Sequence, residues 1–339
     1  MIPVDSLLIG KDLNRLQSRN MFRHFFNIEK NSEIEKQILV LLQKKGEHSN
    51  ELTGLIDAVR TFEKPIRLKV PFLVDGCGTG GDGKKTFNIS TLACLIAAAS
   101  GASVAKHGNR SISSSCGSAD LLESLGLKIE APKNRMLKAL KKFHFGYFHA
   151  PLYHPIFKKI QPIRSELAKK RIKTIFNLAG PFLNPLRPRH QVIGVWRKDL
   201  VFMMAKTAQN LKFKHALIVW NIDGFDELTT SNKTVAAELR ENHLRLKVID
   251  PKQFHLKPVK PSDLTGGSIH KNRRITNVIL SGKMKNGKFD VVLLNAGAIL
   301  YVSGKVKTIR EGILLAKQGV YSQSANRLLK NVIRISHDS

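Results

Sequence analysis

Residues 75–91 read DGCGTGGDGKKTFNIST and place five glycines among the eight residues from Gly76 to Gly83. An apolar run, LKVPFLV at 68–74, comes before this stretch, and an alanine-rich run, STLACLIAAAS at 90–100, follows its last residues. Glycine is costly to order and is kept where the backbone needs a positive φ or must lie close to another group. The pattern therefore predicts a strand, a loop that closely approaches a ligand, and a helix.

The pattern of apolar residues changes at Pro65, before the glycine loop. From residue 6 to about 62, apolar residues recur at helical spacing, with a turn at Gly46 and 48–50. After Pro65, short apolar runs alternate with helical segments, which is typical of a mainly parallel sheet with crossover helices. We predict strands at 68–75, 102–108, 192–196 and 215–220, and a strand that passes into a helix at 291–302.

These elements predict an α/β fold with two domains. A small all-helical domain is expected at residues 1–64, joined in space by part of 155–190. A large α/β domain with a central, mainly parallel sheet is expected at residues 65–339.

Composition restricts the class of protein. The chain has 56 Lys and Arg against 26 Asp and Glu, and its net charge of +30 attracts polyanions. The three cysteines form no CxxC pair, so neither a zinc site nor a disulfide framework is expected. We find no signal-peptide pattern and no run of about 18 apolar residues. We therefore expect a cytoplasmic protein that has no membrane partner.

Two familiar phosphate-binding patterns fit the loop poorly. Gly76, Gly78 and Gly81 match a dinucleotide-binding G-x-G-x-x-G, but no Asp or Glu lies between Gly83 and Ala119 to hold the ribose hydroxyls. Residues 78–84 match a Walker A loop only up to its lysine, because the next position carries lysine instead of Ser or Thr.

A third interpretation treats the acid-free segment as one anion site built from two strand–loop–helix units. Its cations and hydroxyls suit a diphosphate and its metal, while Asp82 could accept a hydrogen bond from a sugar hydroxyl. We expect Ser118 to be the N-cap of the second helix and Gly126 to end it. The polar groups concerned are Lys84, Lys85, Lys106, His107, Arg110, Thr86, Ser90, Thr91, Ser111, Ser113 and Ser114.

The same residues resemble the anthranilate phosphoribosyltransferase family. The resemblance is carried by DGCGTGGDGKKTFNIST at 75–91 and VAKHGNRSISSSCGSADLLESLG at 104–126. It continues through HPIFKKIQPIRSEL at 154–167, TIFNLAGPFLNP at 174–185, GFDELTT at 224–230 and VLLNAGAILYV at 292–302. It implies a Mg²⁺-dependent pentosyltransferase of tryptophan biosynthesis that uses two ions and forms a homodimer. The implied reaction transfers the phosphoribosyl group of 5-phosphoribosyl 1-diphosphate to the amine of anthranilate and releases pyrophosphate.

The resemblance also implies site residues. The phosphoribosyl-diphosphate site would comprise Gly78, Gly81, Asp82, Thr86, Asn88, Ile89, Ser90, Thr91, Lys106, His107, Gly108, Asn109, Arg110, Ser111, Ile112, Ser113, Ser114 and Ser118. Anthranilate would contact Gly78, Asn109 and Arg164, and the metal would bind Ser90, Asp226 and Glu227. Residues 226 and 227 would point about 100° apart on a helix, so joint metal binding requires an irregular loop. No side chain is assigned as a catalytic nucleophile or base.

Two departures from the family pattern lie near this site. Ser115 and Cys116 stand where the family commonly has Lys and Ser, and AKKRIK at 168–173 is longer than usual and carries extra lysines. Two alternative functions remain. One is a non-catalytic relative that binds nucleic acid through its basic surface, and the other is a pyrimidine-nucleoside phosphorylase on a related fold.

Overall fold

The computed structural model describes residues 4–27, 33–66, 68–111 and 115–338. Four helices open the chain: α1 (Val4–Leu8), α2 (Arg15–Asn27), α3 (Glu33–Lys45) and α4 (Ser49–Arg60). The turn expected at Gly46 and 48–50 is confirmed only up to residue 48: α3 ends at Lys45, Gly46 has a φ of 87°, and α4 already begins at Ser49. His48 caps α4, and the Glu51 carboxylate accepts a hydrogen bond from its backbone N–H.

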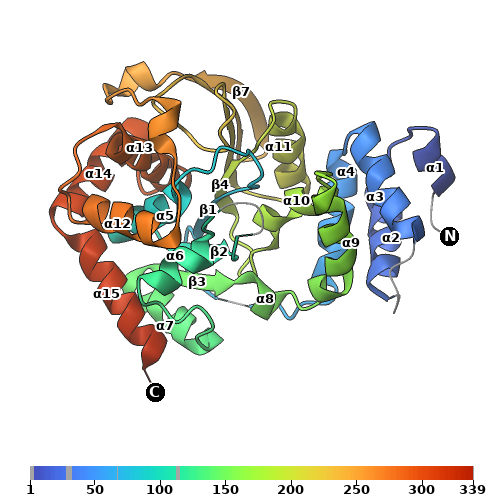
Figure 1. Cartoon of the computed structure of the whole chain (residues 1–339), viewed down its shortest axis with the longest axis horizontal. Helices are drawn as coiled ribbons and strands as arrows, with labels where there is room; N and C mark the ends of the chain where they lie inside the picture. Colours follow the sequence, from blue (N-terminus) through green and yellow to red (C-terminus); the bar gives the residue numbers. More distant parts are fainter. Residues whose placement is uncertain (1–3, 28–32, 67, 112–114, 339) are drawn as a thin grey trace.

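A seven-stranded sheet forms the centre of the molecule (Figure 1), in the order β3-β2-β1-β4-β5-β6-β7. The first five strands in this order are parallel, and β6 and β7 continue the sheet antiparallel. The mainly parallel sheet predicted from sequence is therefore confirmed. The strands are β1 (Val74–Gly78), β2 (Val104–Gly108), β3 (Phe145–His149), β4 (His190–Gly194), β5 (His215–Asn221), β6 (Thr234–Arg240) and β7 (His243–Ile249).

Helices cover both faces of the sheet. The longer helices after β1 are α5 (Ile89–Ala99), α7 (Lys133–Phe143), α9 (Phe157–Lys169), α11 (Leu200–Asn210), α12 (Ile269–Leu280), α13 (Gly287–Val302), α14 (Ile309–Tyr321) and α15 (Ser324–His337). Shorter helices are α6 (Ser118–Ser124), α8 (Ala150–Tyr153), α10 (Ile175–Ala179), η1 (Gly180–Leu183), η2 (Pro251–Phe254) and η3 (Pro261–Leu264). Among the described helices, none has the length and apolar character needed to cross a membrane.

Two predicted strands differ from the structure. Of residues 68–75 only Val74 and Asp75 belong to a strand, because Pro71 and Phe72 form a turn and β1 begins at Val74. Residues 291–302 lie wholly within α13, which is helical from Gly287 to Val302. The apolar run resembled a strand because α13 is buried almost all round, between α5, α14 and the sheet, and so shows no polar face.

The buried side chains form two hydrophobic cores, one on each face of the sheet. Strand β5 alternates between them, with Leu217 and Val219 in the core beneath α5 and α13, and Ala216 and Ile218 in the other. The second core also contains α2, α3 and α4 together with α9 and α10. The N-terminal helices thus pack with part of residues 155–190, while the division of the chain at residue 64 stays a prediction.

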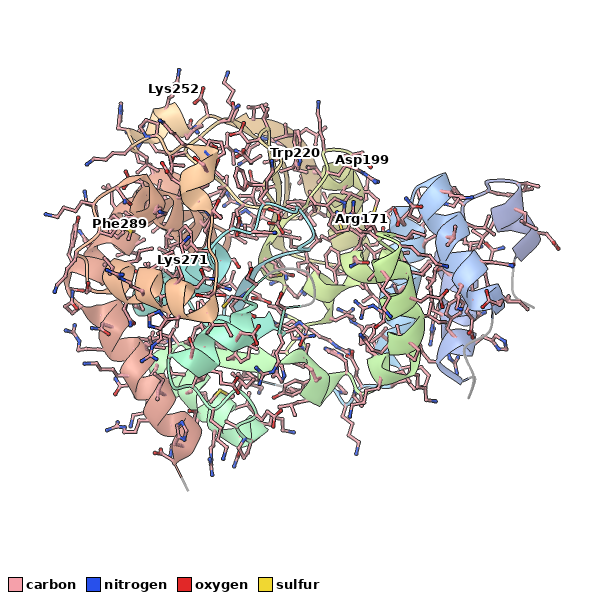
Figure 2. The ribbon with its side chains drawn as sticks, viewed as in Figure 1. Arg171, Asp199, Trp220, Lys252, Lys271 and Phe289 are labelled. Carbon is pink, nitrogen blue, oxygen red and sulfur yellow. The ribbon has the colours of Figure 1, made fainter. Side chains whose placement is uncertain are left out.

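Positively charged side chains are widely spread over the surface. In the view of Figure 2, nitrogen-tipped side chains project around the whole outline, and Lys252 is one of them. The net charge of +30 is therefore not confined to one stripe in this view.

A buried polar network joins β1 to β2 and to the segment after η1. Asp75 is fully buried, and its carboxylate accepts hydrogen bonds from Asn184 Nδ2 at 2.9 Å and from the His107 backbone N–H at 3.3 Å. The buried Lys106 ammonium donates to the Gly76 carbonyl at 2.8 Å. Burial raises the pKa of Asp75, whereas the positive charge of Lys106 opposes this rise. These contacts hold the ends of β1 and β2 in fixed positions below the glycine loop.

Replacing Asp75 with alanine should destabilise the fold strongly. The substitution removes the negative charge near Lys106 and the acceptor of the Asn184 amide in the interior, and we expect a loss of about 3–5 kcal/mol in the free energy of unfolding by urea. The matched control Asp263→Ala removes an exposed carboxylate and should change the free energy by less than about 0.5 kcal/mol. Equal stability of the two variants would contradict a structural role for the network.

Candidate active site

The candidate site lies at the carboxyl ends of the parallel strands. The loops that follow β1, β2, β3, β4 and β5 meet at this edge of the sheet, which is where open α/β sheets bind ligands. The loop after β1 holds the glycine-rich stretch, and the loop after β5 holds Asp226 and Glu227. Residues predicted from distant parts of the sequence are thus brought to one edge.

Three carboxylates form a compact acidic cluster at this edge: Asp82, Asp226 and Glu227. One ligand atom from each lies within 4.8 Å of the others. The Gly80 N–H donates to Asp226 Oδ2 at 2.9 Å, and the Lys84 N–H donates to Asp82 Oδ1 at 3.0 Å. Residues 226 and 227 belong to an irregular loop, as joint metal binding requires.

The environment of the cluster disfavours three negative charges without a cation. Burial, and then the charge of Asp82, raise the pKa of Asp226 to about 7. Burial, and then Asp226, raise the pKa of Glu227 well above its ordinary value. Both shifts follow from carboxylates that are out of water and close to like charges.

The cluster fits a hard divalent cation. Asp82 Oδ2 and Glu227 Oε2 are buried and have no hydrogen-bond partner in the described part of the chain. Buried oxygen atoms of this kind are the ligands that Mg²⁺ takes from proteins. Ser90, the third predicted ligand, lies in the first turn of α5, and within the described ranges no hydrogen bond joins it to the cluster.

Two glycines make room for Asp226. Gly78 at the end of β1 pairs in register with Gly194 at the end of β4. A Cβ on Gly78 would lie 2.2 Å from Asp226 Oδ2, and one on Gly194 would lie 1.4 Å from the Asp226 carbonyl oxygen. Neither strand end therefore tolerates a side chain while Asp226 keeps this position.

The start of α5 joins the glycine loop to neighbouring segments. Asn88 Nδ2 donates to the Cys116 carbonyl at 3.0 Å, and Asn272 Nδ2 donates to Asn88 Oδ1 at 3.1 Å. Thr86 makes an isolated bridge to Thr265, whereas Ile89 and Thr91 are buried in the first turn of α5. These predicted residues are thus grouped around the end of the loop.

The segment after β2 forms the second predicted wall. Arg110 makes a bidentate ion pair with Glu123 and also contacts Asp120, while the Ser111 N–H donates to Asp120. Exposed Asn109 accepts a hydrogen bond from Ser118 Oγ through its carbonyl. Ile112, Ser113 and Ser114 lie outside the described residues.

The predicted N-cap of α6 is wrong by one residue. Gly117 is the N-cap and Ser118 is the first helical residue, because the Asp120 carboxylate accepts the Gly117 N–H at 2.8 Å. Ser118 Oγ lies instead 2.1 Å from where a Cβ on Gly108 would stand, so Gly108 must lack a side chain. Gly126 has a φ of 101° and follows the end of α6, as expected.

Lys106 and His107, which were predicted to contact phosphoribosyl diphosphate, are both buried and already contact other groups of the protein. The Lys106 ammonium is engaged by the Gly76 carbonyl, and the His107 ring packs edge-on against His154 with 5.2 Å between ring centroids. Burial, and then His154, lower the pKa of His107 well below its ordinary value.

Arg164 is a half-buried cation on α9. Its guanidinium lies 5.8 Å from the centroid of the Phe157 ring, and in the described residues it makes no hydrogen bond or ion pair. Burial lowers its pKa. Within the same ranges, no contact joins Arg164 to Gly78 or Asn109, the other two residues predicted for the acceptor.

Sequence reasoning missed two features of the site. Asp82, expected to contact a sugar, lies within the acidic cluster. Lys173, from the long AKKRIK segment, donates to the Gly81 carbonyl at 2.5 Å and lies 4.5 Å from the centroid of the Trp196 ring. The unusual segment therefore reaches the glycine loop itself. The length of that segment was the only sequence signal for this contact.

Comparisons with known proteins agree with this geometry. Residues 71–325 match the family model described as "Glycosyl transferase family, a/b domain". The anthranilate phosphoribosyltransferase of Clostridium kluyveri is 36% identical over 98% of each chain. The crystal structure of the anthranilate phosphoribosyltransferase from Thermus thermophilus has a TM-score of 0.92 at 34% identity and covers 100% of both chains.

A more distant solved structure carries ligands. The anthranilate phosphoribosyltransferase from Saccharomyces cerevisiae, in complex with PRPP and Mg, has a TM-score of 0.88 at 26% identity, covering 98% of this chain and 96% of its own. The same yeast enzyme has also been solved in complex with 4-fluoroanthranilate, with a TM-score of 0.86 at 25% identity over the same shares of the two chains.

Adding a methyl group at Gly78 should weaken divalent-cation binding. In Gly78→Ala the new Cβ displaces the Asp226 carboxylate, and we expect the Mg²⁺ affinity measured by calorimetry to fall at least about tenfold. Gly180→Ala is the matched control, because Gly180 is exposed, a Cβ there meets open space and its φ is not positive. Similar Mg²⁺ affinities in the two variants would refute the assigned position of Asp226.

Proposed function

The chain belongs to the anthranilate phosphoribosyltransferase family, and we propose that it transfers the phosphoribosyl group of 5-phosphoribosyl 1-diphosphate to the amine of anthranilate, releasing pyrophosphate. This is a step of tryptophan biosynthesis. The observation that carries the proposal is the acidic cluster of Asp82, Asp226 and Glu227 beside a glycine loop. Carboxylates for a metal and backbone donors for a diphosphate then lie at one sheet edge.

The proposed reaction requires no side chain that acts as a nucleophile or as a strong base. Departure of pyrophosphate builds positive charge on the sugar and negative charge on the leaving group, so fixed donors and cations near the diphosphate lower the barrier. Asp82, Asp226 and Glu227 would hold Mg²⁺, and two ions are proposed. Bound magnesium supplies positive charge that offsets the charge developing on the diphosphate.

The glycine loop and the first turn of α5 provide the remaining donors. Backbone N–H groups from Gly81 to Gly83 and the hydroxyls of Ser90 and Thr91 are proposed to face the diphosphate and the sugar phosphate. Lys173 would have to exchange the Gly81 carbonyl for a phosphate oxygen when this substrate binds. The segment after β2 is proposed to contact the substrate through residues 108–111 and Ser118.

Arg164 is proposed to pair with the anthranilate carboxylate. Its guanidinium is half-buried and has no acidic partner among the described side chains, so it is available for an anion. The amine of anthranilate is uncharged near neutral pH, and its attack therefore depends on position rather than on a strong base. Gly78 and Asn109 would complete the acceptor site.

Assembly and location are part of the same proposal. We infer a cytoplasmic homodimer that joins through the helical domain, with substrates bound between that domain and the α/β domain. The resemblance of the chain to the family supports this arrangement. Closure of the two domains would exclude the water that could otherwise intercept the activated sugar.

Anthranilate fluorescence provides the direct test of the reaction. Mixing the protein with Mg²⁺, 5-phosphoribosyl 1-diphosphate and anthranilate should deplete the fluorescence and release an equal amount of pyrophosphate. The double variant Asp226→Asn, Glu227→Gln should lower the rate by at least about 100-fold, because the metal then loses its charged ligands. Undiminished turnover in the variant would refute the metal assignment, and an inactive wild-type protein would refute the function.

Removing Arg164 should affect the acceptor selectively. In Arg164→Ala we expect the KM for anthranilate to rise about tenfold or more, because the ion pair with its carboxylate is lost, with a much smaller change for 5-phosphoribosyl 1-diphosphate. Lys169→Ala, an exposed cation in the last turn of the same helix, is the control. Equal increases for both substrates would remove the assigned role.

A further inference from the structure

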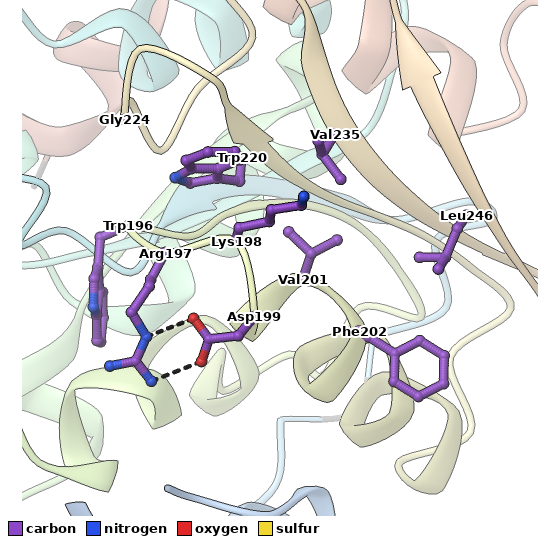
Figure 3. A pocket seen from close by; sticks show the side chains of 10 residues that line it. All are labelled: Trp196, Arg197, Lys198, Asp199, Val201, Phe202, Trp220, Gly224, Val235 and Leu246. Atoms are coloured by element: carbon purple, nitrogen blue, oxygen red, sulfur yellow. Dashed lines mark hydrogen bonds and ion pairs between the residues drawn. The ribbon is translucent and has the colours of Figure 1, made fainter.

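A cavity lies beside the proposed substrate site, at the β4 to β7 end of the same sheet edge (Figure 3). It has a volume of about 630 Å³ and lies between the loop after β4, the start of α11 and the strands β5, β6 and β7. Its walls include Trp196, Phe202, Trp220, Val235 and Leu246. A volume of this size falls in the range of sites for small organic molecules.

Three aromatic side chains contribute to the walls of this cavity. The chain has two tryptophans, Trp196 and Trp220, and both line it. In Figure 3 the Trp220 ring lies at one side of the space and the Phe202 ring at the other. Phe202 is 48% exposed and Leu246 is 63% exposed, so both present apolar surface to a molecule in the cavity. Flat rings pack well against a planar apolar ligand.

An exposed lysine enters the same space. Arg197 is neutralised by Asp199, with Nε to Oδ1 at 2.6 Å and a second hydrogen bond at 2.8 Å. Lys198 lies between them in sequence, is exposed, and in the described ranges its ammonium makes no hydrogen bond or ion pair. Figure 3 shows its side chain extending across the cavity toward Val235. The cavity therefore offers aromatic walls and a positive charge that can pair with an anion.

Two lysines separate the cavity from the acidic cluster. Lys173 lies over the Trp196 ring and donates to the Gly81 carbonyl, so it occupies the far side of that wall. Lys84 lies 5.4 Å from the centroid of the Phe225 ring and packs against Gly224, which lines the cavity. A molecule in the cavity would contact Trp196 and Gly224 on the side that faces away from the carboxylates of the acidic cluster.

We propose that this cavity binds a small planar aromatic carboxylate as a second ligand, distinct from the acceptor that Arg164 would hold. The ring would pack between Trp196, Trp220 and Phe202, and the carboxylate would pair with Lys198. A neutral aromatic molecule would gain the ring contacts but not the ion pair. An aliphatic anion would gain the ion pair but little of the apolar contact.

The two tryptophans make the site directly observable. Titration of the wild-type protein with 4-nitrobenzoate, a planar aromatic carboxylate that quenches indole fluorescence on contact, should give saturable quenching. The neutral analogue 4-nitrobenzyl alcohol should bind about threefold to fivefold more weakly, the size expected of one exposed ion pair. N-acetyl-tryptophanamide gives the baseline for collisional quenching, which rises linearly.

Matched variants identify the site. Lys198→Met should reduce the affinity for 4-nitrobenzoate to that for the alcohol, while Lys252→Met, a remote exposed lysine, should leave the preference unchanged. Val235→Phe fills the cavity and should abolish saturable quenching, and circular dichroism would verify that this variant is folded. Arg164→Ala should not change the quenching.

Each of the contrary outcomes overturns the proposal. Linear quenching, or equal affinity for the acid and the alcohol, would show that no such site exists. Saturable quenching that disappears in Arg164→Ala would place the probe at the acceptor position instead. Absence of quenching together with a smaller sedimentation coefficient for Leu246→Asp would show that a second copy of the chain covers this face.

Discussion

The site depends on one packing constraint: Asp226 packs against the ends of two strands, and both strand ends carry glycine. Gly78 and Gly194 face each other across β1 and β4, and any side chain at either position would occupy the space that Asp226 fills. The loop after β5 can therefore lie directly on the ends of β1 and β4. This position brings Asp226 and Glu227 to within 4.8 Å of Asp82, although the sequence separates them by more than 140 residues.

This close seating has an electrostatic consequence. Three carboxylates that are close together and out of water repel one another, so the pKa values of Asp226 and Glu227 rise. The Gly80 N–H stabilises only one of the oxygens concerned. A bound cation would relieve the repulsion and satisfy the two unpartnered oxygens at the same time. The protein thus holds its acidic groups in a geometry that favours a metal complex over the empty site.

Local patterns explain which parts of this arrangement could be predicted from sequence. The glycine loop and the adjacent acids carry their own signals, because positive φ and close approach select glycine, and strand ends of a parallel sheet converge. The strand predicted at 291–302 failed because a helix buried on all sides has no polar face to reveal its period. The place of Asp82 in the acidic cluster and the contact of Lys173 were not predicted, because both depend on segments about 90 to 145 residues apart, such as Lys173 with Gly81.

Several positively charged side chains near the site already make hydrogen bonds or ion pairs within the protein. Arg110 is paired with Asp120 and Glu123, Lys106 with the Gly76 carbonyl, and Lys173 with the Gly81 carbonyl. Among the described residues, a polyanion attracted by the overall charge of +30 would have to displace these contacts to reach the glycine loop, whereas Arg164 and Lys198 are unpaired. An anion held here must replace existing contacts in a defined geometry, which a compact diphosphate with its metal can do. An extended nucleic acid gains most from many independent exposed phosphate contacts, so the local pairing favours the small ligand.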